Sequence, residues 1–323
     1  MERLAVIGLG NIATRHRRNL KLRFPAAKLF SMSSSGRIPT ESIECCDELV
    51  SSIADIIKEK VQLVIVASPA PFHAKHAIPL IKAGIPTLIE KPVTTTVEEA
   101  QLIQQAINYY QTPVAIGYCL RYLPSALKLK ELLAQRKIGT MYNAHIEIGQ
   151  YLPDWRPNKD YRQCVSANKN LGGGALFELS HELDYTQWLL GPLTVQHAIL
   201  RSSQELKLDV EDVADILTTN NENVVTTIHL DFLQRKAHRQ CSFIGSEGRI
   251  DWDLIQNQLL FTTATNSSVV YQDPMWDKNQ MYLAMIDDFI QMIEGLPHTC
   301  ITIEEAQSTV MLIDDIRRQT ERE

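Results

Sequence analysis

Short apolar runs alternate with amphipathic segments over the first 120 residues of the chain. The apolar runs have the length of strands and lack alternating polar side chains, which is typical of strands buried on both faces. They occupy residues 4–7, 28–31, 63–67, 87–89 and 114–116. Segments with helical spacing separate them, at residues 12–22, 54–59, 74–83 and 97–110. This alternation predicts an α/β domain built on a doubly wound parallel sheet.

Local signals mark the ends of some of these helices. Thr96 stands three residues before Glu99, which is the spacing of a capping box at a helix N-terminus. Thr302 and Glu305 repeat this spacing near the C-terminus. Gly84 follows the third helix, where glycine readily adopts the left-handed conformation that ends a helix. These signals predict helix boundaries at residues 96, 84 and 302.

The pattern changes at about residue 140, where strand-like segments dominate. They cover residues 141–151, 194–201, 213–219, 224–232, 238–244 and 249–254, with helices expected at 174–190, 280–293 and 304–318. This order predicts an α+β domain with a largely antiparallel, open sheet. We therefore expect two domains, residues 1–120 and 121–323. The closing helices are expected either to stay with the second domain or to pack back on the first.

Composition narrows the class of protein. The 323 residues are 45% hydrophobic and 22% charged, which suits folded domains and excludes disorder. No apolar run approaches the roughly 18–20 residues of a spanning helix, so a membrane protein is not expected. The net charge of −6 gives no general attraction to nucleic acid or anionic lipid. The first residues enter a strand pattern at once, so no signal peptide is predicted.

The six cysteines show no zinc-binding or redox spacing. Cys45 and Cys46 are adjacent and make a poor disulfide pair. We expect free thiols, a reducing cytoplasm and no metal site.

A glycine-rich turn lies between the first strand and the first helix. Gly8 and Gly10 match the first two positions of G-x-G-x-x-G/A, and Ala13 matches the third. The main chain at Asn11 and Ile12 then opens the helix, whose free N–H groups and partial positive charge suit a pyrophosphate. The alternative is a structural turn that binds nothing. The strand–turn–helix context favours a dinucleotide site and a Rossmann domain.

The second strand ends without the acidic residue that would hold an NAD ribose. It leads instead into Ser33, Ser34 and, shortly after, Arg37. Hydroxyl groups and a guanidinium suit a 2′-phosphate. The alternative is that Arg37 is a solvated loop residue. We predict NADP as the preferred cofactor and NAD as the other option.

Several further motifs occur in a fixed order along the chain. Residues 68–73 read Ser-Pro-Ala-Pro-Phe-His, residues 90–92 read Glu-Lys-Pro, and residues 117–124 read Gly-Tyr-Cys-Leu-Arg-Tyr-Leu-Pro. His16 follows the glycine turn, and residues 172–184 and 244–252 add two blocks in the second domain. Together they resemble the glucose–fructose oxidoreductase/inositol dehydrogenase/rhizopine catabolism (Gfo/Idh/MocA) family. This resemblance covers the chain from about residue 3 to the closing helices.

Members of that family are NAD(P)-dependent oxidoreductases acting mostly on sugars, cyclitols and nucleotide sugars. The resemblance implies that Ser68, Pro69, His73 and Glu90 contribute to the cofactor site. It also implies that Lys91 lies near both the nicotinamide and the reacting hydroxyl. An ammonium there can hydrogen-bond a carbonyl during reduction and exchange a proton. Taken alone, Lys91 would more often be a surface lysine, but it follows a strand end where α/β sheets bind ligands.

The second-domain helix departs from the family pattern of Asp, three residues, then His. Glu178 precedes His181 by only three residues, so either His181 or Glu182 occupies the family's histidine position. We prefer His181 as a catalytic residue because Asp184 then keeps the family's His-x-x-Asp spacing. An imidazole also titrates near neutral pH. Glu178 is expected to orient His181 or to hold a sugar hydroxyl, and the alternative for His181 is a purely structural contact.

The segment from 151 to 170 resembles a loop over a cleft. It combines aromatic residues with four basic and two acidic side chains, including Tyr151, Trp155, Arg156 and Arg162. This mixture suits a sugar that carries a phosphate, nucleotide or carboxylate, and the alternative is a packed loop whose charges face water. The substrate site is predicted to comprise Arg121, Tyr151, Trp155, Arg162, Glu178 and Asp184. Cys119 replaces an asparagine common among relatives, whereas Arg121 is retained.

These observations predict an oxidoreductase that moves hydride between nicotinamide C4 and a secondary alcohol or ketone of a sugar, cyclitol or nucleotide sugar. Lys91 and His181 are expected to handle the hydroxyl proton. The alternatives are reduction of a C=N or C=C bond, and a sensor that binds dinucleotide without catalysis. A homodimer or homotetramer is expected if the second-domain sheet leaves one face open. Neither nucleic acid nor a membrane is an expected partner.

Overall fold

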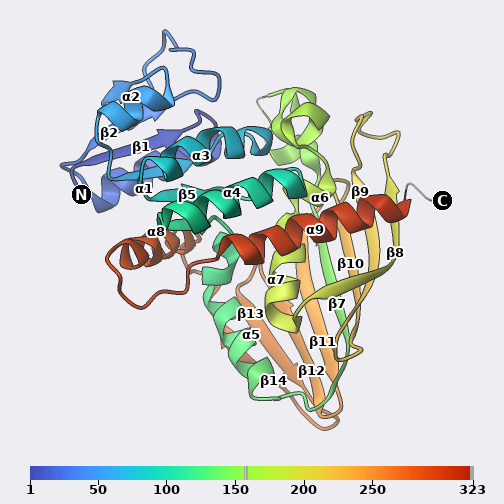
Figure 1. The fold of residues 1–323 in the computed structure, drawn as a ribbon. Helices are drawn as coiled ribbons and strands as arrows, with labels where there is room; N and C mark the ends of the chain where they lie inside the picture. The colour runs from blue at the N-terminus through green and yellow to red at the C-terminus, as the bar shows by residue number, and fades with distance from the viewer. Residues whose placement is uncertain (156, 158, 321–323) are drawn as a thin grey trace. The chain divides into compact units, whose positions relative to one another are not determined.

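The computed structural model describes residues 1–155, 157 and 159–320. The chain divides into two compact units. Unit 1 contains residues 1–118 and 282–310, and unit 2 contains residues 119–281 and the chain from residue 311 onward. Figure 1 shows the elements of both units in chain order.

Unit 1 is a parallel sheet covered on both faces. Its strands are β1 (Arg3–Ile7), β2 (Lys28–Met32), β3 (Glu48–Leu49), β4 (Leu63–Val66), β5 (Thr87–Ile89) and β6 (Val114–Ile116). Among the described residues they form one sheet in the order β3-β2-β1-β4-β5-β6, with parallel pairing throughout. The predicted doubly wound parallel sheet is therefore confirmed. The order reverses between β1 and β4, and such a switch point is where α/β sheets bind ligands.

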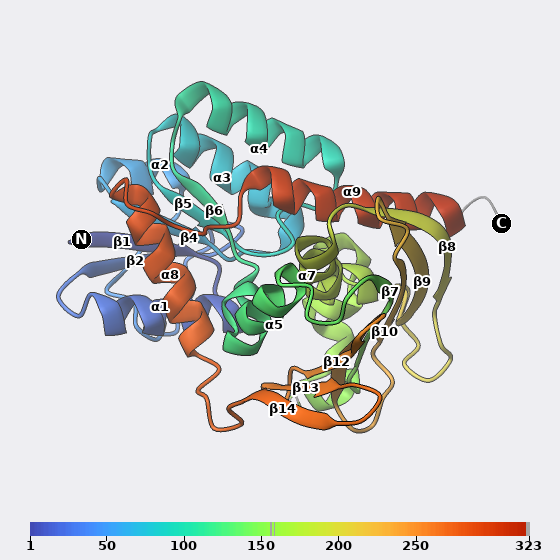
Figure 2. The same ribbon diagram turned by 90° about the horizontal axis from the view of Figure 1, so that it is seen from below.

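Helices lie on both faces of this sheet. They are α1 (Asn11–Arg23), α2 (Ile53–Lys58), η1 (Ala70–Phe72), α3 (His73–Lys82), α4 (Val97–Tyr110), most of α8 (Gln280–Ile293) and the first part of α9 (Ile303–Thr320). Figure 2 shows α1 and α8 on one face and α2, α3 and α4 on the other. The apolar residues of β1 are almost fully buried between these layers, as the lack of polar alternation predicts.

The predicted helix boundaries are confirmed by hydrogen bonds and backbone angles. The Glu99 N–H donates to Thr96 Oγ1, and Thr302 and Glu305 form both bonds of a capping box. Gly84 has a φ of 71° immediately after α3 and its C-cap residue. These local interactions end the elements where the chain turns back toward the sheet.

Unit 2 is built on an open, mostly antiparallel sheet. Its strands are β7 (Met141–Gly149), β8 (Leu193–Arg201), β9 (Val213–Asn220), β10 (Val225–Asp231), β11 (His238–Gly245), β12 (Gly248–Asp253), β13 (Gln258–Thr262) and β14 (Ser267–Gln272). Within the described residues their order is β14-β13-β12-β11-β7-β10-β9-β8, and only β7 and β10 pair in parallel. The predicted α+β domain is confirmed.

Helices of unit 2 lie on one face of this sheet (Figures 1 and 2). They are η2 (Cys119–Tyr122), α5 (Pro124–Ala134), α6 (Ala175–Glu178), α7 (Ser180–Leu190) and the end of α9, with four short turns η3 (Leu152–Trp155), η4 (Tyr161–Gln163), η5 (Val165–Ala167) and η6 (Lys169–Leu171). Along β10, Thr226, Ile228 and Leu230 are buried on the helix-covered face. The alternate side chains, such as Thr227 and His229, lie on the opposite face.

Some elements differ from the prediction. Helix α5 begins at the end of the motif at residues 117–124 and was not predicted. Its Ala126, Leu129 and Leu132 are buried. Strands β3, β13 and β14 were also missed, since they are short and partly polar. The helix expected at 174–190 is broken at Leu179, whose φ of −97° and ψ of 25° separate α6 from α7.

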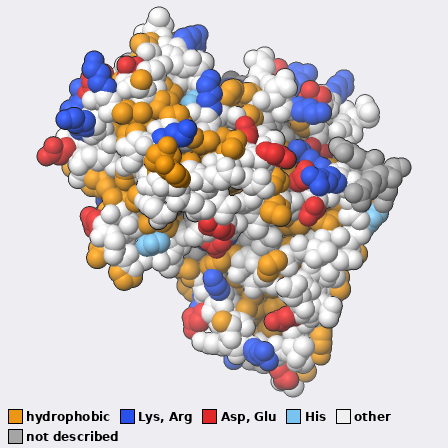
Figure 3. All heavy atoms as spheres, viewed as in Figure 1, with side chains coloured by type: hydrophobic (Ala, Val, Ile, Leu, Met, Phe, Trp, Pro, Cys, Tyr) orange, Lys and Arg blue, Asp and Glu red, His pale blue; other side chains and the backbone are white. Residues whose placement is uncertain are grey.

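The surface carries charges of both signs. Figure 3 shows lysine, arginine, aspartate and glutamate side chains interspersed with apolar ones on the face it displays. In the part of the chain that the structure describes, no helix combines the length and apolarity needed to cross a membrane.

Candidate active site

The site residues predicted in unit 1 gather at the carboxyl edge of its parallel sheet. Gly8 follows β1, Ser33 follows β2, Ser68 follows β4, and Glu90 follows β5. Neighbouring parallel strands end at the same edge, so these segments are neighbours in space. The residues predicted in unit 2 lie on α7, on η2 and on the segment from 151 to 171.

The glycine turn has the geometry that a dinucleotide requires. Gly8 has a φ of 117°, and a Cβ there would lie 2.3 Å from the carbonyl oxygen of Ala67. A Cβ on Gly10 would instead meet no atom within 4 Å. Gly10 is also the N-cap of α1 and has no side-chain cap, so the first N–H groups of this helix remain available. The main chain of Asn11 and Ile12 therefore faces space where a phosphate fits.

The loop after β2 holds the predicted 2′-phosphate residues. The Ser33 hydroxyl donates to the Arg37 carbonyl oxygen at 2.7 Å, which closes the loop on itself. Ser34 is half-buried, and Arg37 is exposed and forms no ion pair with any described residue. The guanidinium of Arg37 is therefore available to an anion, whereas the Ser33 hydroxyl already has an acceptor.

His73 ties the loop after β4 to the loop after β5. Its Nε2 lies 2.7 Å from the Ser68 carbonyl oxygen, and its Nδ1 lies 3.0 Å from that of Pro92. Burial lowers the pKa of His73, although these hydrogen bonds oppose the shift. His76, whose Nδ1 is 3.0 Å from the Ser68 hydroxyl, has its pKa lowered to about 4, mainly by burial. Both imidazoles thus serve as fixed supports, and Pro69 lies in the loop that they support.

Glu90 points into the protein. Its Oε1 is 2.6 Å from Nε2 of His16, and both side chains are buried. Its Oε2 accepts the backbone N–H of Lys91 at 3.1 Å. Gly117 packs closely on it, since a Cβ there would lie 3.2 Å from the carboxylate carbon. Glu90 therefore anchors the segment that carries Lys91. The sequence pattern did not predict that His16 would be its partner.

In unit 2, the glycines at 172–174 set the start of α6. Gly174 has a φ of 107°, and a Cβ there would lie 2.3 Å from Glu211 Oε1. The Glu211 carboxylate accepts the Leu176 N–H, and its backbone carbonyl accepts the Ala175 N–H. Burial raises the pKa of Glu211, while Arg317 opposes the shift. Glu211 thus caps α6, a contact that the sequence pattern did not indicate.

Glu178 and His181 are half-buried and three residues apart on the α6–α7 segment. The Ser166 hydroxyl donates to Glu178 Oε2 at 3.0 Å. The break at Leu179 lies between them, so Glu178 ends α6 and His181 lies in the first turn of α7.

Glu182 has a different environment from His181. It is fully buried, and its Oε1 accepts hydrogen bonds from Arg239 at 2.7 Å and from the Tyr185 hydroxyl at 3.3 Å. Burial alone would lower the pKa of Arg239, but the electrostatic interactions with Glu182 and Tyr185 are larger together and raise it. Burial raises the pKa values of Tyr185 and Cys241, whose polar atoms lie 3.2 Å apart. Glu182 therefore belongs to an ionic cluster between α7 and the sheet.

Arg121 and Asp184 bind each other. The Arg121 Nε and Nη2 atoms donate to the two carboxylate oxygens at 2.9 and 2.7 Å, and both side chains are buried. The guanidinium also lies 5.6 Å from the Trp188 ring centroid. This bidentate ion pair joins η2 to α7. The pair brings together two residues predicted for the substrate site.

The 151–171 segment is a series of short turns with mostly internal contacts. The Tyr151 ring lies under Arg235, 3.7 Å from the guanidinium carbon, and Arg162 pairs with Asp160. Trp155 packs edge-on against Phe232, and its buried Nε1 has no partner among the described residues. Of the predicted aromatic and basic residues, Trp155 thus retains an unused donor. Arg156 lies outside the described residues.

Two family models match the chain. The model described as "Oxidoreductase family, NAD-binding Rossmann fold" matches residues 2–118, and the "GFO/IDH/MocA C-terminal domain" matches residues 126–251. The chain belongs to the GFO/IDH/MocA family of NAD-binding oxidoreductases. The predicted family membership is thereby confirmed.

Individual relatives of this GFO/IDH/MocA protein are distant. Oxidoreductase P35 of Formosa agariphila is 25% identical over 80% of this chain and 79% of its own length. An inositol 2-dehydrogenase of Rubrobacter xylanophilus is 25% identical over 58% of this chain and 53% of its own length. The chain thus spans about half of that enzyme. A levoglucosan dehydrogenase solved with NADH shares the fold with a TM-score of 0.86, 18% identity and coverage of 99% and 97% of the two chains.

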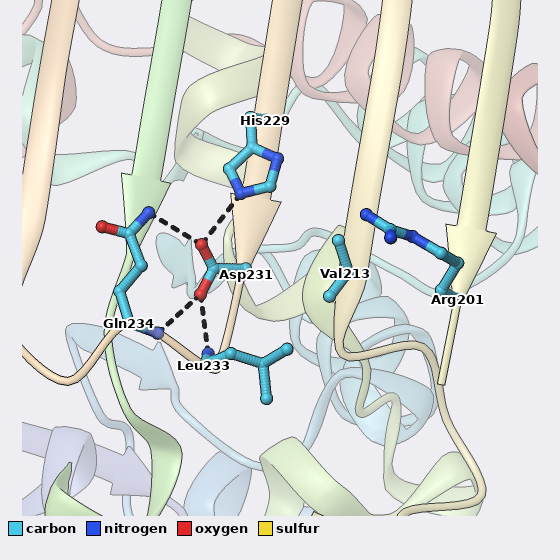
Figure 4. A pocket seen from close by; sticks show the side chains of 6 residues that line it. All are labelled: Arg201, Val213, His229, Asp231, Leu233 and Gln234. Atoms are coloured by element: carbon cyan, nitrogen blue, oxygen red, sulfur yellow. Dashed lines mark hydrogen bonds and ion pairs between the residues drawn. The ribbon is translucent and has the colours of Figure 1, made fainter. Parts of the chain in front are cut away.

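A separate polar cluster lies on the open face of the unit 2 sheet. His229 on β10 bonds Asp215 through Nδ1 at 2.6 Å and Asp231 through Nε2 at 2.9 Å. Asp231 also accepts from Gln234 and from two backbone N–H groups. Figure 4 shows His229, Asp231 and Gln234 on the side of the sheet away from the helices, around a hollow of about 310 Å³ that Arg201 also lines. Each charged or titratable side chain named in this cluster has a protein partner, including Arg201, which donates to Asp215.

This cluster makes stability depend on pH. The hydrogen bond to Asp231 is the main cause that raises the pKa of His229 to about 9, and burial opposes it. Protonated His229 therefore stabilises the folded state fully below about pH 6.5, and this stabilisation is lost as the pH rises through 9. We expect His229→Asn to lower the free energy of unfolding by about 1 kcal/mol at pH 6, after allowance for solvent screening, and by much less at pH 10.

Urea unfolding at pH 6 and pH 10 measures this difference. The control is His145→Asn on the same face, because His145 bonds the Thr227 hydroxyl and no described carboxylate. An equal loss at both pH values for His229→Asn would show that its charge contributes nothing.

Proposed function

We propose that this oxidoreductase transfers hydride between nicotinamide C4 and a secondary alcohol or ketone of a sugar, cyclitol or nucleotide sugar. The observation that carries the proposal is the anchoring of Lys91 at the end of β5 by the buried His16–Glu90 pair. The name of the Rubrobacter xylanophilus relative, inositol 2-dehydrogenase, supports a cyclitol or sugar substrate. The dinucleotide, when bound at the Gly8–Gly10 turn, would supply the hydride chemistry.

The protein's own groups handle the proton. In our proposal the Lys91 ammonium hydrogen-bonds the oxygen of the reacting carbon, and His181 takes up the hydroxyl proton as the alcohol becomes a ketone. In the reverse direction His181 returns that proton. His181 is favoured over Glu182 because Glu182 is fully buried and bound to Arg239, whereas His181 is partly exposed. Glu178, which accepts a hydrogen bond from Ser166, orients His181 or binds a sugar hydroxyl in this proposal.

The remaining predicted residues have supporting and binding roles in this proposal. Trp155 is partly exposed and offers an apolar ring, which suits the face of a sugar. Arg162 is exposed and adds positive charge for an anionic substituent. Arg121 and Asp184 hold η2 and α7 together through their ion pair, and Tyr151 stabilises the loop through Arg235. A substrate with a phosphate, nucleotide or carboxylate group fits this set.

Replacing Lys91 tests the catalytic role. We expect Lys91→Met to lower kcat/KM by about 10²–10⁴-fold, because the transition state loses the charged hydrogen bond to the oxygen of the reacting carbon. Affinity for NADH, followed by fluorescence, should change by less than about threefold. The assay is reduction of NAD(P)⁺ with a panel of cyclitols, aldoses and nucleotide sugars. Lys82→Met is the control, since Lys82 is an exposed residue in the last turn of α3.

Undiminished turnover in Lys91→Met would contradict the proposed role. If the natural protein bound NADH but converted no member of the panel, reduction of a C=N or C=C bond, or a sensor function, would be favoured instead.

We also propose that NADPH is preferred over NADH. The support is the exposed Arg37, which has no described ion-pair partner, and the lack of a carboxylate in the Ser33–Arg37 loop. We expect tenfold tighter NADPH binding, about 1.4 kcal/mol, in parallel fluorescence titrations. Arg37→Ala should remove most of this preference by weakening NADPH binding alone, so NADH is the internal control. Tighter NADH binding by the natural protein would refute the 2′-phosphate site.

We also propose that the protein forms a homodimer or homotetramer and that its subunits associate through the open face of the unit 2 sheet. Ile199 on β8 and Leu217 on β9 are exposed there, 46% and 37%, without a covering helix in the described chain. Light scattering after size exclusion should give a multiple of 36.6 kDa, and Leu217→Glu should shift it toward the monomer. A monomer at all concentrations of the natural protein would contradict this.

A further inference from the structure

Arg17 is a buried cation at the base of the dinucleotide turn. It lies in the second turn of α1, and its side chain is 2% exposed. It is among the largest fully buried side chains of the described protein. A guanidinium is expensive to remove from water, so its surroundings have to supply compensating contacts.

The guanidinium joins three segments through hydrogen bonds. Nη1 donates to the Gly8 carbonyl oxygen at 3.2 Å, and Nη2 donates to Thr14 Oγ1 at 2.8 Å. Nε donates to the carbonyl oxygen of Glu44 at 2.8 Å, in the segment that precedes β3. Thr14 in turn donates to the carbonyl oxygen of Gly10. Arg17 therefore fixes both glycines of the turn, Gly8 directly and Gly10 through Thr14.

All three acceptors of Arg17 are uncharged. The Glu44 carboxylate binds Arg18 instead, with two contacts of 2.7 Å, and no carboxylate in the described chain forms an ion pair with Arg17. Burial lowers the pKa of Arg17, while the thiols of Cys46 and Cys45 and the Glu44 carboxylate oppose this shift. Arg17 is thus a buried positive charge with no carboxylate of the described chain within ion-pair distance.

We propose that Arg17 is a determinant of dinucleotide affinity, which positions the Gly8–Gly10 turn and provides positive charge for the cofactor's phosphates. The missing Cβ of Gly10 faces open space, so a phosphate can approach the turn that Arg17 holds. The positive charge adds to the partial charge of the α1 N-terminus. Arg17 acts through the turn, as a positioning residue, in addition to its electrostatic effect.

The neighbouring Arg18 provides a matched control. Arg17→Met and Arg18→Met each remove one positive charge from the same helix, but Arg18 is exposed and its guanidinium forms an ion pair with Glu44. We expect the NADH dissociation constant to rise tenfold or more in Arg17→Met and to stay within twofold in Arg18→Met. Fluorescence titration measures both constants, and thermal unfolding with far-UV circular dichroism confirms that each variant is folded.

One further variant, Arg17→Lys, and a series of salt concentrations separate the effect of charge from that of shape. Arg17→Lys keeps the charge but loses the forked donor set, so its affinity should fall between those of the natural protein and Arg17→Met. The dependence of NADH affinity on KCl concentration should flatten in Arg17→Met and persist in Arg17→Lys, a change that a purely structural role would not produce.

A folded Arg17→Met protein that binds NADH as tightly as Arg18→Met would overturn the proposal. If Arg17→Met does not fold, Arg17→Gln decides the question, because it removes the charge but keeps a polar group with two N–H donors at the site. NADH binding by folded Arg17→Gln within twofold of the natural protein would equally refute it, whereas a tenfold loss would support it.

Discussion

The hydrogen bond between His16 and Glu90 links the cofactor turn to the proposed catalytic lysine within unit 1. His16 lies one and a half turns into α1, which starts directly after the glycines, and Glu90 directly precedes Lys91. Both side chains are buried, so separating them would leave an uncompensated buried carboxylate, at a penalty of several kcal/mol. The helix that receives the phosphates and the strand end that carries Lys91 are therefore held in one frame. His73 extends this frame to the loop after β4.

Local patterns were sufficient for much of the fold and for the glycine turn. The strands of unit 1 are apolar throughout because both faces are covered, and Gly8 is required because a Cβ would collide with Ala67. Contacts between distant residues were not predictable. Arg17 meets Glu44, 27 residues away, and Leu176 meets Glu211, 35 residues away. No periodicity encodes such a pairing, because it depends on which segments the sheet brings together.

The choice between His181 and Glu182 illustrates the same limit. Residues 178, 181, 182 and 185 share one face of an ideal helix, so spacing alone left both candidates open. The break at Leu179 and the position of Arg239 on β11, 57 residues beyond Glu182, give the two side chains different environments. Glu182 forms a buried ion pair with Arg239. Removal of either partner would leave the other as an uncompensated buried charge. The partly exposed imidazole is then the group that can exchange a proton with a ligand.

The buried charges of the two units differ in how they are compensated. In unit 2, Arg121 faces Asp184 and Arg239 faces Glu182, so each of these two cations has a carboxylate within hydrogen-bond distance. Arg17 in unit 1 has only neutral acceptors. A ligand that supplies negative charge beside Arg17 would recover electrostatic energy that the unbound fold lacks. Because any ligand that binds only the folded state also stabilises it, the same interaction couples cofactor binding to the stability of unit 1. The uncompensated charge therefore belongs to the binding function of the fold rather than to its packing.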